Sequence, residues 1–302
     1  MTMDKSTING NARLRRERGD WLTESIIWIL LAAFCFLCVY PFWYILVASF
    51  NDGYDMMKGG IYWWPRKFTT FNYATFFSEV SWTRALGVSV ERTAVGGVVT
   101  TLFTCLVAYA LSRRNLIFGK TYRKMFVFSM YVSGGLIPFY FILRLMGLIN
   151  TFWVYIIPGM LNLYFVMVGI NFFRSIPDAL IESAYIDGAS EIRIFIRIVL
   201  PLSMPFIATL ALFACVGQWN SWIDSVYYVN DKSLRPMAYQ MVTLLNRTQG
   251  SSTNTDITSE ITMTTLTSQA TAVVITVAPI LMLYPFLQKY FVQGMMIGSV
   301  KE

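Results

Sequence analysis

A group of acidic residues interrupts an otherwise apolar sequence in the stretch IPDALIESAYIDGASEIRIFIRIVLP, residues 176–201. Asp178 and Glu182 lie four positions apart, so on a helix their side chains share one face. The chain contains no histidine, which excludes histidine-based metal sites, proton relays and nucleophile–base pairs. Carboxylates on one helix face can instead form charge-assisted hydrogen bonds with a basic partner. These residues are therefore predicted to bind a basic partner and not to catalyse a reaction.

The same stretch predicts two short helices joined at a glycine. Gly188 suits the left-handed position that ends the first helix. Ser190 suits the N-cap of the second helix, with Glu191 in its first turn. Four apolar residues of the second helix follow the spacing of a single face: Ile192, Phe195, Ile196 and Val199. We refer to residues 174–201 as the acidic hairpin.

The composition indicates a membrane protein. The 302 residues are 56% hydrophobic and only 14% charged, with a mean hydropathy of +0.52, whereas a soluble domain carries about 25% charged residues. The four cysteines lie inside apolar runs: Cys35, Cys38, Cys105 and Cys215. They are predicted to act as small hydrophobic side chains and not as a disulfide framework.

Six apolar runs approach the roughly 20 residues that a helix needs to cross a bilayer. The runs are residues 26–49, 85–111, 125–143, 152–173, 200–223 and 270–290. The sequence thus predicts an all-α membrane protein of six transmembrane helices, with the acidic hairpin between the fourth and fifth. The predicted division is a tail (1–20), a membrane domain (21–290) with outer loops 51–83 and 224–268, and a second tail (291–302). A short helix at 71–77 and a tight turn at 147–150 are also expected.

The distribution of lysine and arginine predicts the orientation. With the N-terminus inside, fifteen of the 24 basic residues fall on the inner side and seven on the outer side; Arg92 and Arg144 lie within or beside the spans. Because basic residues favour the cytoplasmic side, both termini and the acidic hairpin are expected to be cytoplasmic.

Glu91 and Arg92 form a pair of opposite charges inside the second predicted span. An ionisable pair within a membrane is a functional hypothesis by default. The favoured interpretation is simpler: both side chains lie near the outer end of the span and reach water or lipid headgroups.

One segment has a partial likeness to a nucleotide-binding loop. Phe118, Gly119, Lys120 and Thr121 supply the end of that motif, but its first glycine position holds Arg114. No β-strand is predicted before it. The chain is therefore expected to have no ATP site of its own.

Three groups within the acidic hairpin resemble the "EAA" loop of binding-protein-dependent ABC importer permeases. They are Glu182-Ser183-Ala184, Asp187-Gly188-Ala189 and Leu200-Pro201. Ser183 stands where the family usually has alanine. The segments 108–113 and 219–220 and the C-terminal tail are similar to the carbohydrate branch of the family, specifically the maltose-type second permease of oligosaccharide importers.

This resemblance implies a type I ABC importer fold in the bacterial inner membrane. It implies four kinds of association: a second, different permease, two ATP-binding subunits, an extracellular solute-binding protein, and membrane lipid, with no nucleic acid. ATP and Mg would be held by the partner ATPase subunits, so this chain would be no enzyme and would bind no cofactor or metal. The residues implied to couple to the ATPase are Asp178, Glu182, Ser183, Ala184, Asp187, Gly188, Ala189, Leu200 and Pro201.

The implied substrate is a sugar or oligosaccharide. Candidate side chains for its pathway are Asn162, Tyr164, Gln218, Trp219 and Asn220. Helix–helix packing is the alternative role for each of them. The outer loop 224–268 is expected to touch the binding protein. An ion-coupled secondary transporter or a channel for a small polar solute is the rival function, but it would need buried carboxylates, and only Glu91 qualifies.

Overall fold

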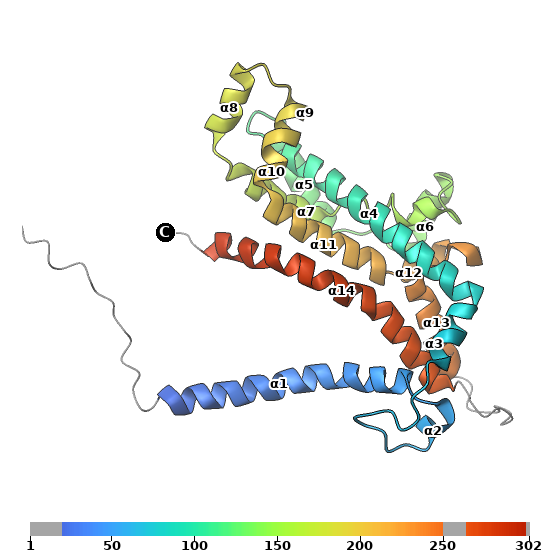
Figure 1. Ribbon diagram of the computed structural model, residues 1–302. Helices are drawn as coiled ribbons and strands as arrows, with labels where there is room; N and C mark the ends of the chain where they lie inside the picture. Colours follow the sequence, from blue (N-terminus) through green and yellow to red (C-terminus); the bar gives the residue numbers. More distant parts are fainter. Residues whose placement is uncertain (1–19, 250–263, 300–302) are drawn as a thin grey trace, which may run out of the picture.

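The computed structural model of the chain describes residues 20–249 and 264–299, and these form helices joined by loops (Figure 1). The long helices are α1 (Asp20–Ser49), α4 (Val80–Ser112), α11 (Met204–Asn220) and α14 (Thr265–Ser299). The shorter ones are α2 (Gly53–Met57), α3 (Phe71–Ser78), α5 (Gly119–Tyr131), α6 (Leu136–Leu145), η1 (Phe152–Tyr155), α7 (Leu163–Arg174), α8 (Asp178–Ile186), α9 (Glu191–Ile194), η2 (Phe195–Val199), α10 (Leu200–Leu202), α12 (Ile223–Tyr228), η3 (Lys232–Leu234) and α13 (Met237–Gln249).

Three segments of the described helices are long and apolar enough to cross a membrane unbroken: Thr23–Ser49, Val80–Ser112 and Thr265–Met282. Three bent helix pairs raise the number to as many as six if each pair counts as one span. They are α5 with α6, bent by 117°, α7 with α8, bent by 75°, and Glu191–Leu202 with α11, bent by 86°. A multi-pass membrane protein is the architecture that these lengths support.

The prediction of an unbroken third span over 125–143 is wrong. Helix α5 ends at Tyr131, and α6 begins only at Leu136. Gly135 has φ +81°, outside the helical region, and the Ser133 hydroxyl accepts a hydrogen bond from its N–H group. A local serine hydrogen bond and a glycine conformation thus replace the helical ladder here.

The fourth predicted span, 152–173, is helical only in its second half. After η1 the chain stays irregular until Asn162, whose side chain accepts a hydrogen bond from the Phe165 N–H group and so caps α7. Pro158 and Gly159 lie in the irregular part, and both residue types disfavour a helix interior.

Several local expectations are confirmed. The short helix predicted at 71–77 is α3. The turn at 147–150 has left-handed backbone at both ends, with φ +69° at Gly147 and +61° at Asn150. The segment 224–268, whose assignment as an outer loop stays a prediction, carries α12, η3, α13 and the start of α14 in its described part. Its Met237 is completely buried beside Phe76 and Trp82.

Helix α4 lies at the centre of the bundle, against α7 and α11. Glycines make this close approach possible. A Cβ atom at Gly97 would lie 2.5 Å from the Cys215 sulfur of α11, and one at Gly169 of α7 would lie 2.9 Å from the Ala108 Cβ atom. Small residues at helix contacts are the usual way in which membrane helices gain close packing.

Helix α1 is attached to the bundle at one end only (Figure 1). Near Ser49 it buries Val47 and Ala48 beside Ala270 of α14. Its other part is exposed, with Trp28 at 71% and Leu37 at 69%. This part therefore offers an apolar surface to lipid or to another chain.

The glycine contact predicts a difference between two positions of the same helix. Gly97→Val should destabilise the fold by about 1–3 kcal/mol, because the new side chain pushes α11 away. Gly87→Val is the matched control, since no atom lies within 4 Å of a Cβ there. Thermal unfolding of both variants in detergent measures the difference. Equal losses of stability would contradict close packing at Gly97.

Candidate functional site

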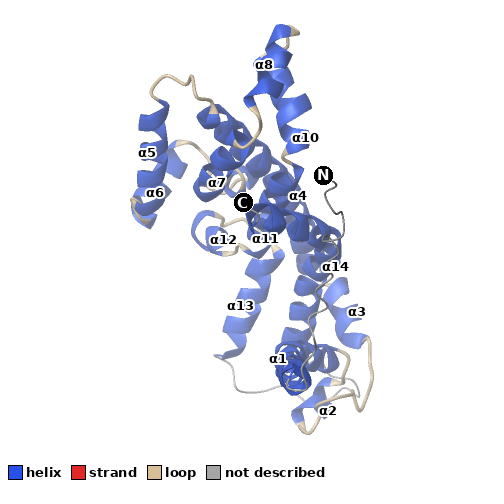
Figure 2. Ribbon diagram, turned by 90° about the vertical axis from the view of Figure 1, so that its left-hand side faces the viewer, coloured by secondary structure: helices blue, strands red, loops and turns tan. Residues whose placement is uncertain are grey.

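The acidic hairpin projects from one end of the bundle, and α3, α12 and α13 lie toward the other end (Figures 1 and 2). Helix α8 forms its outgoing arm. The returning arm consists of α9, the π-helical η2 and α10, which lead into α11. The predicted pair of short helices is thereby confirmed.

The turn between the two arms is built from backbone hydrogen bonds. Gly188, at φ +74°, donates from its N–H group to the Tyr185 carbonyl, and Ala189 donates to the Ala184 carbonyl. This is the Schellman arrangement that ends helices at a left-handed glycine. The Ser190 side chain then accepts from the Arg193 N–H group and caps α9, as its spacing predicted.

The predicted apolar face of the second helix is partly wrong. Ile192 and Ile196 are 72% and 54% exposed, whereas Ile194 is fully buried. Ile192 faces outward already in α9, before η2 begins. The wider π turn of η2 then changes the spacing after Ile194, so that Phe195 and Val199 are buried while Ile196 is exposed. Its last hydrogen bond joins the Leu200 N–H group to the Phe195 carbonyl, five residues back. Pro201 follows directly and has no N–H group to restore the α-helical pattern.

Aromatic rings attach the hairpin to three helices of the bundle. The Phe195 ring lies 5.0 Å from the Tyr109 ring of α4, measured between centroids. The Tyr109 ring lies 6.3 Å from Phe173 of α7, and Phe173 lies 5.6 Å from Phe206 of α11. The buried arm therefore shares one core with α4, α7 and α11.

Glu191 supplies a polar clamp beside these rings. Its carboxylate accepts hydrogen bonds from the hydroxyls of Tyr109 (2.6 Å) and Tyr185, and Arg113 lies 3.4 Å away. Burial alone would raise the pKa of Glu191, but the two hydroxyls and the Arg113 charge outweigh it and lower that pKa. The clamp fixes both arms of the hairpin to the end of α4. Sequence reasoning missed it because Tyr109 and Glu191 are 82 positions apart.

The residues singled out by the EAA-like pattern divide into two groups. Ala184, Ala189 and Leu200 are buried or half-buried against the core of the hairpin. The exposed group is Asp178, Glu182, Ser183, Asp187, Gly188 and Pro201. The first group shapes the hairpin, and the second is available to a partner.

The exposed carboxylates differ in their surroundings. Asp178 lies 3.4 Å from Arg114. Glu182 has no ion-pair partner among the described residues. Near it, Ile186 is 87% exposed, a feature that the acidic pattern had not indicated. The surface thus combines an unpaired charge with an apolar residue, as protein-binding surfaces do.

A groove of about 1110 Å³ lies between the end of α4 and the hairpin. Leu102 and Leu106 line one side, and Glu182 and Ile192 line the other. The two sides of this groove do not touch. The contacts that join the hairpin to α4 are the Glu191 clamp and the neighbouring aromatic pair of Tyr109 and Phe195.

A sharp bend connects the hairpin to α11. The chain turns by 86° at Ser203, between Pro201 and Pro205. Neither proline can donate a helical hydrogen bond, which explains a bend at this point. The Ser203 hydroxyl is buried and has no hydrogen-bond partner in the part of the chain that the structure describes. The hairpin is therefore continuous with α11 through a bend in the helix.

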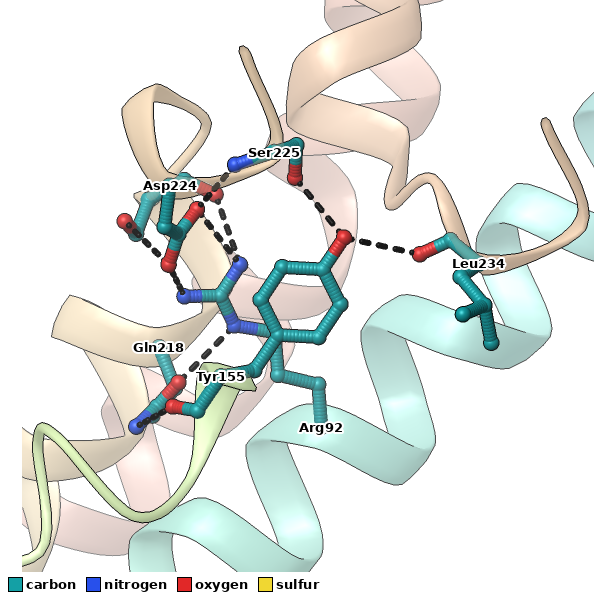
Figure 3. A network of polar contacts seen from close by, with 7 residues as sticks. Arg92, Tyr155, Gln218, Asp224, Ser225 and Leu234 are labelled. Atoms are coloured by element: carbon teal, nitrogen blue, oxygen red, sulfur yellow. Dashed lines mark hydrogen bonds and ion pairs between the residues drawn. The ribbon is translucent and has the colours of Figure 1, made fainter. Parts of the chain in front are cut away.

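A second polar centre joins α4, η1, α11 and α12 (Figure 3). Arg92 donates from Nε to the Gln218 side chain (2.8 Å) and from its terminal nitrogens to the Asp224 carboxylate. Its guanidinium also lies 4.3 Å from the centre of the Tyr155 ring. The Tyr155 hydroxyl donates to the Leu234 carbonyl at 2.9 Å. The network closes the bundle at the end away from the hairpin.

The favoured interpretation of Glu91 and Arg92 is thus wrong for Arg92. Its side chain is only 2% exposed and reaches neither water nor headgroups, whereas Glu91 is exposed. The adjacent carboxylate is not its partner. The partner of Arg92 is instead Asp224, which lies 132 positions away. Asp224 directly follows the predicted end of the fifth span at residue 223.

The five candidate pathway residues lie in different environments. Gln218 donates to the Tyr155 carbonyl, and Trp219 donates to the Thr276 carbonyl, so both side chains serve helix contacts. Asn162 caps α7 and is half-buried. Tyr164 is 60% exposed, and Asn220 is exposed as well. These last two have the side chains most open to a passing solute.

The Glu191 clamp predicts local stability of the hairpin. Glu191→Ala should loosen the hairpin by about 1 kcal/mol, a discounted value because the carboxylate is half exposed. Limited trypsin digestion at Arg193 and Arg197 should then be about fivefold faster. Ser183→Ala is the control, because its hydroxyl bonds only to the Leu180 carbonyl of its own helix. Unchanged digestion of the Glu191 variant would contradict the clamp.

The Arg92 network predicts non-additive mutations. Arg92→Met and Asp224→Asn should each destabilise the protein by about 2–3 kcal/mol, because each leaves a charge without its partner. The double variant should lose much less than the sum. Denaturant unfolding in detergent gives the three values, and strict additivity would show that the pair is not coupled.

Comparisons with known proteins agree with this geometry. Residues 9–297 match the family described as "Binding-protein-dependent transport system inner membrane component". The chain is 39% identical to Protein LplC of Bacillus subtilis (strain 168), over 88% of this chain and 90% of that protein. It is 35% identical to the polygalacturonan/rhamnogalacturonan transport system permease protein YtcP of the same organism, over 93% of this chain and 98% of YtcP.

The fold also matches a solved structure. A chain in the crystal structure of a bacterial ABC transporter involved in the import of the acidic polysaccharide alginate superposes with a TM-score of 0.82 and 23% identity. The match covers 91% of this chain and 98% of that one. The family match spans nearly the whole sequence, and the fold is that of an ABC importer permease. The chain therefore belongs to the inner membrane components of binding-protein-dependent transport systems.

Proposed function

We propose that this permease forms half of the translocation pathway of an ATP-driven importer for a sugar or oligosaccharide, and that the acidic hairpin is its coupling element. The observation that carries the proposal is the hairpin itself. It presents an unpaired Glu182 and an exposed Ile186, and it is clamped to α4 and continuous with α11.

The proposed arrangement has six spans. They are α1, α4, the broken pair α5–α6, residues 152–174, α11 and α14. Basic residues near the hairpin end of the bundle, such as Arg113, Lys120 and Arg174, support a cytoplasmic hairpin and cytoplasmic tails at residues 1–20 and 291–302. The N-terminal tail lies almost wholly outside the described residues, and α14 runs on through Tyr290 to Ser299. Residues 21–290 make up the membrane domain.

The proposed partners follow from the surfaces. The exposed side of the hairpin would meet an ATP-binding subunit, and the complete importer would hold two of these, with ATP and Mg bound there. A second permease would complete the pathway. The extracellular binding protein would deliver solute at the opposite end, where the loops 51–83 and 224–268 lie.

The proposed mechanism is mechanical coupling. ATP-driven closure of the ATPase subunits would displace the hairpin, which moves as one body because its turn is hydrogen-bonded and its buried arm is packed. The Glu191 clamp would carry the displacement to α4, and the bend at Ser203 would carry it to α11. Glu182 is the carboxylate that we assign to an ion pair with the ATPase, since Arg114 already lies beside Asp178.

A carbohydrate substrate is supported by relatives of the chain. Besides YtcP, they include the arabinooligosaccharides transport system permease protein AraQ of Halalkalibacterium halodurans, 27% identical. Sugar hydroxyls need hydrogen-bonding groups and aromatic faces along their route. Tyr164 and Asn220 are exposed and of these types; Asn162 is half-exposed, and Gln218 and Trp219 would shape the route from behind.

An ion-coupled secondary transporter or channel is not favoured. Such a protein needs ionisable side chains that can bind and release ions within its spans. Among the described residues, Arg92 is buried but neutralised by Asp224, and Glu91 is exposed. The strongly buried carboxylates of the described residues are Asp52, the N-cap of α2, and Asp55 within α2, and both lie outside the proposed spans.

The coupling role predicts a defect that is specific to one charge. Glu182→Lys should abolish sugar uptake by the reconstituted importer while ATP hydrolysis no longer responds to the loaded binding protein, because the new charge repels a basic partner. Uptake and hydrolysis are measured together in proteoliposomes.

Thr121→Lys is the control for adding a positive charge at the same end of the bundle, because Thr121 is exposed and lies outside the hairpin. It should leave uptake unchanged. Normal uptake by the Glu182 variant would remove Glu182 from the coupling contact.

A further inference from the structure

The third span contains a break at membrane depth. Helix α5 has 13 residues before the break, so it is about 20 Å long and shorter than a hydrocarbon core of about 30 Å, and α6 continues after a bend of 117°. Lys120 and Lys124 mark its basic end. The break at residues 132–135 therefore lies well inside the hydrocarbon region and not at its edge.

The break exposes polar backbone. The N–H groups of Ser133 and Gly134 have no hydrogen-bond partner within the described part of the chain; that of Gly135 is bonded to the Ser133 hydroxyl. All three residues are exposed, and their side chains are too small to cover the backbone. The adjacent Tyr131 is 83% exposed.

The irregular part of the fourth span shows how such a break is normally satisfied. The Thr100 hydroxyl of α4 donates to the Gly159 carbonyl, and the Thr104 hydroxyl accepts from the Asn162 N–H group. The Gln218 side chain of α11 donates to the Tyr155 carbonyl. This segment is bonded to neighbouring helices of the subunit, whereas the N–H groups of Ser133 and Gly134 have no partner among the described residues.

Lipid cannot supply hydrogen-bond partners for these backbone groups. Hydrocarbon offers no hydrogen-bond partner, so irregular backbone at this depth is found only inside protein or along a water-filled cavity. Helices α5 and α6 lie on a flank of the bundle, with α7 on their inner side and away from α14 (Figure 2). The outer side of this flank must therefore face a water-filled cavity or another protein chain in the assembled protein.

We propose that the break at Ser133, Gly134 and Gly135 lines the aqueous translocation pathway and offers its backbone N–H and C=O groups to the hydroxyls of the passing sugar, with Tyr131 as a neighbouring aromatic surface. This rests on the proposed function, and it names the part of the chain that meets the substrate. Backbone groups suit a route for a hydroxyl-rich solute, because they donate and accept without a fixed charge that would hold it.

A single cysteine tests the proposal. Gly134→Cys fits the backbone, since Gly134 has no left-handed φ and a Cβ atom there would lie 3.8 Å from the nearest atom, Cβ of Pro138. The variant is reconstituted with the complete importer and treated with a membrane-impermeant cationic thiosulfonate. The native Cys35 and Cys38, exposed near the middle of α1, are internal controls for sites that face lipid.

The expected result is modification of the introduced thiol at least about tenfold faster than that of Cys35 or Cys38, because only a hydrated thiol ionises and reacts. Modification should block uptake, and the transported sugar should slow it. An introduced thiol that resists the reagent would overturn the proposal, as would one that instead forms a disulfide with the second permease. If Gly134→Cys does not assemble, Ser133→Cys replaces it.

The failure of this inference is distinguishable from failure of the proposed function. ATP-dependent sugar uptake by the unmodified variant establishes the function, whatever the labelling shows. Uptake without labelling removes the pathway role of the break alone. Absence of ATP-dependent sugar uptake by the unaltered protein would instead remove the proposed function.

Discussion

The lack of hydrogen-bond partners in hydrocarbon is the constraint on which this structure depends. Helix α4 meets it with an unbroken series of helical hydrogen bonds; its glycines let α11 approach closely, and Gly169 of α7 lets α7 approach. The fourth span leaves the helical pattern and meets the constraint with threonine and glutamine side chains from α4 and α11. The third span also leaves the helical pattern, and there the N–H groups of Ser133 and Gly134 have no partner in the described part of the chain. The need for a polar neighbour therefore marks one flank of the bundle as distinct from a surface that faces lipid.

The two polar centres have complementary roles at opposite ends of α4. Arg92 joins α4 to α11 and α12 through a buried ion pair, and Glu191 joins α4 to the acidic hairpin through two tyrosine hydroxyls. A buried ion pair is costly to disrupt by removing one partner. The half-exposed clamp is weaker. The end that holds the bundle together is thus the firmer one, and the end proposed to meet the ATPase is the more easily displaced.

Local patterns predicted local structure well. Gly188 and Ser190 indicated the turn and cap of the hairpin because each acts on backbone groups a few residues away. The centres built by Arg92 and Glu191 could not be predicted, since their partners come from residues 132 and 82 positions distant. The break in the third span had a signal in Ser133-Gly134-Gly135, but hydropathy does not register it. The π turn of η2 shifted the apolar face by an amount that no helical spacing anticipates.

The Schellman turn of the hairpin has a consequence for how partner recognition can change. Its geometry depends on Gly188, on the buried Ala184 and on the half-buried Ala189, and none of these supplies the exposed charge. Ser183 replaces the family's usual alanine at an exposed position, where its hydroxyl bonds within its own helix. Shape and recognition are therefore carried by different side chains. Substitutions at the exposed positions of the hairpin would therefore alter the proposed contact with the ATPase while the hairpin keeps its form.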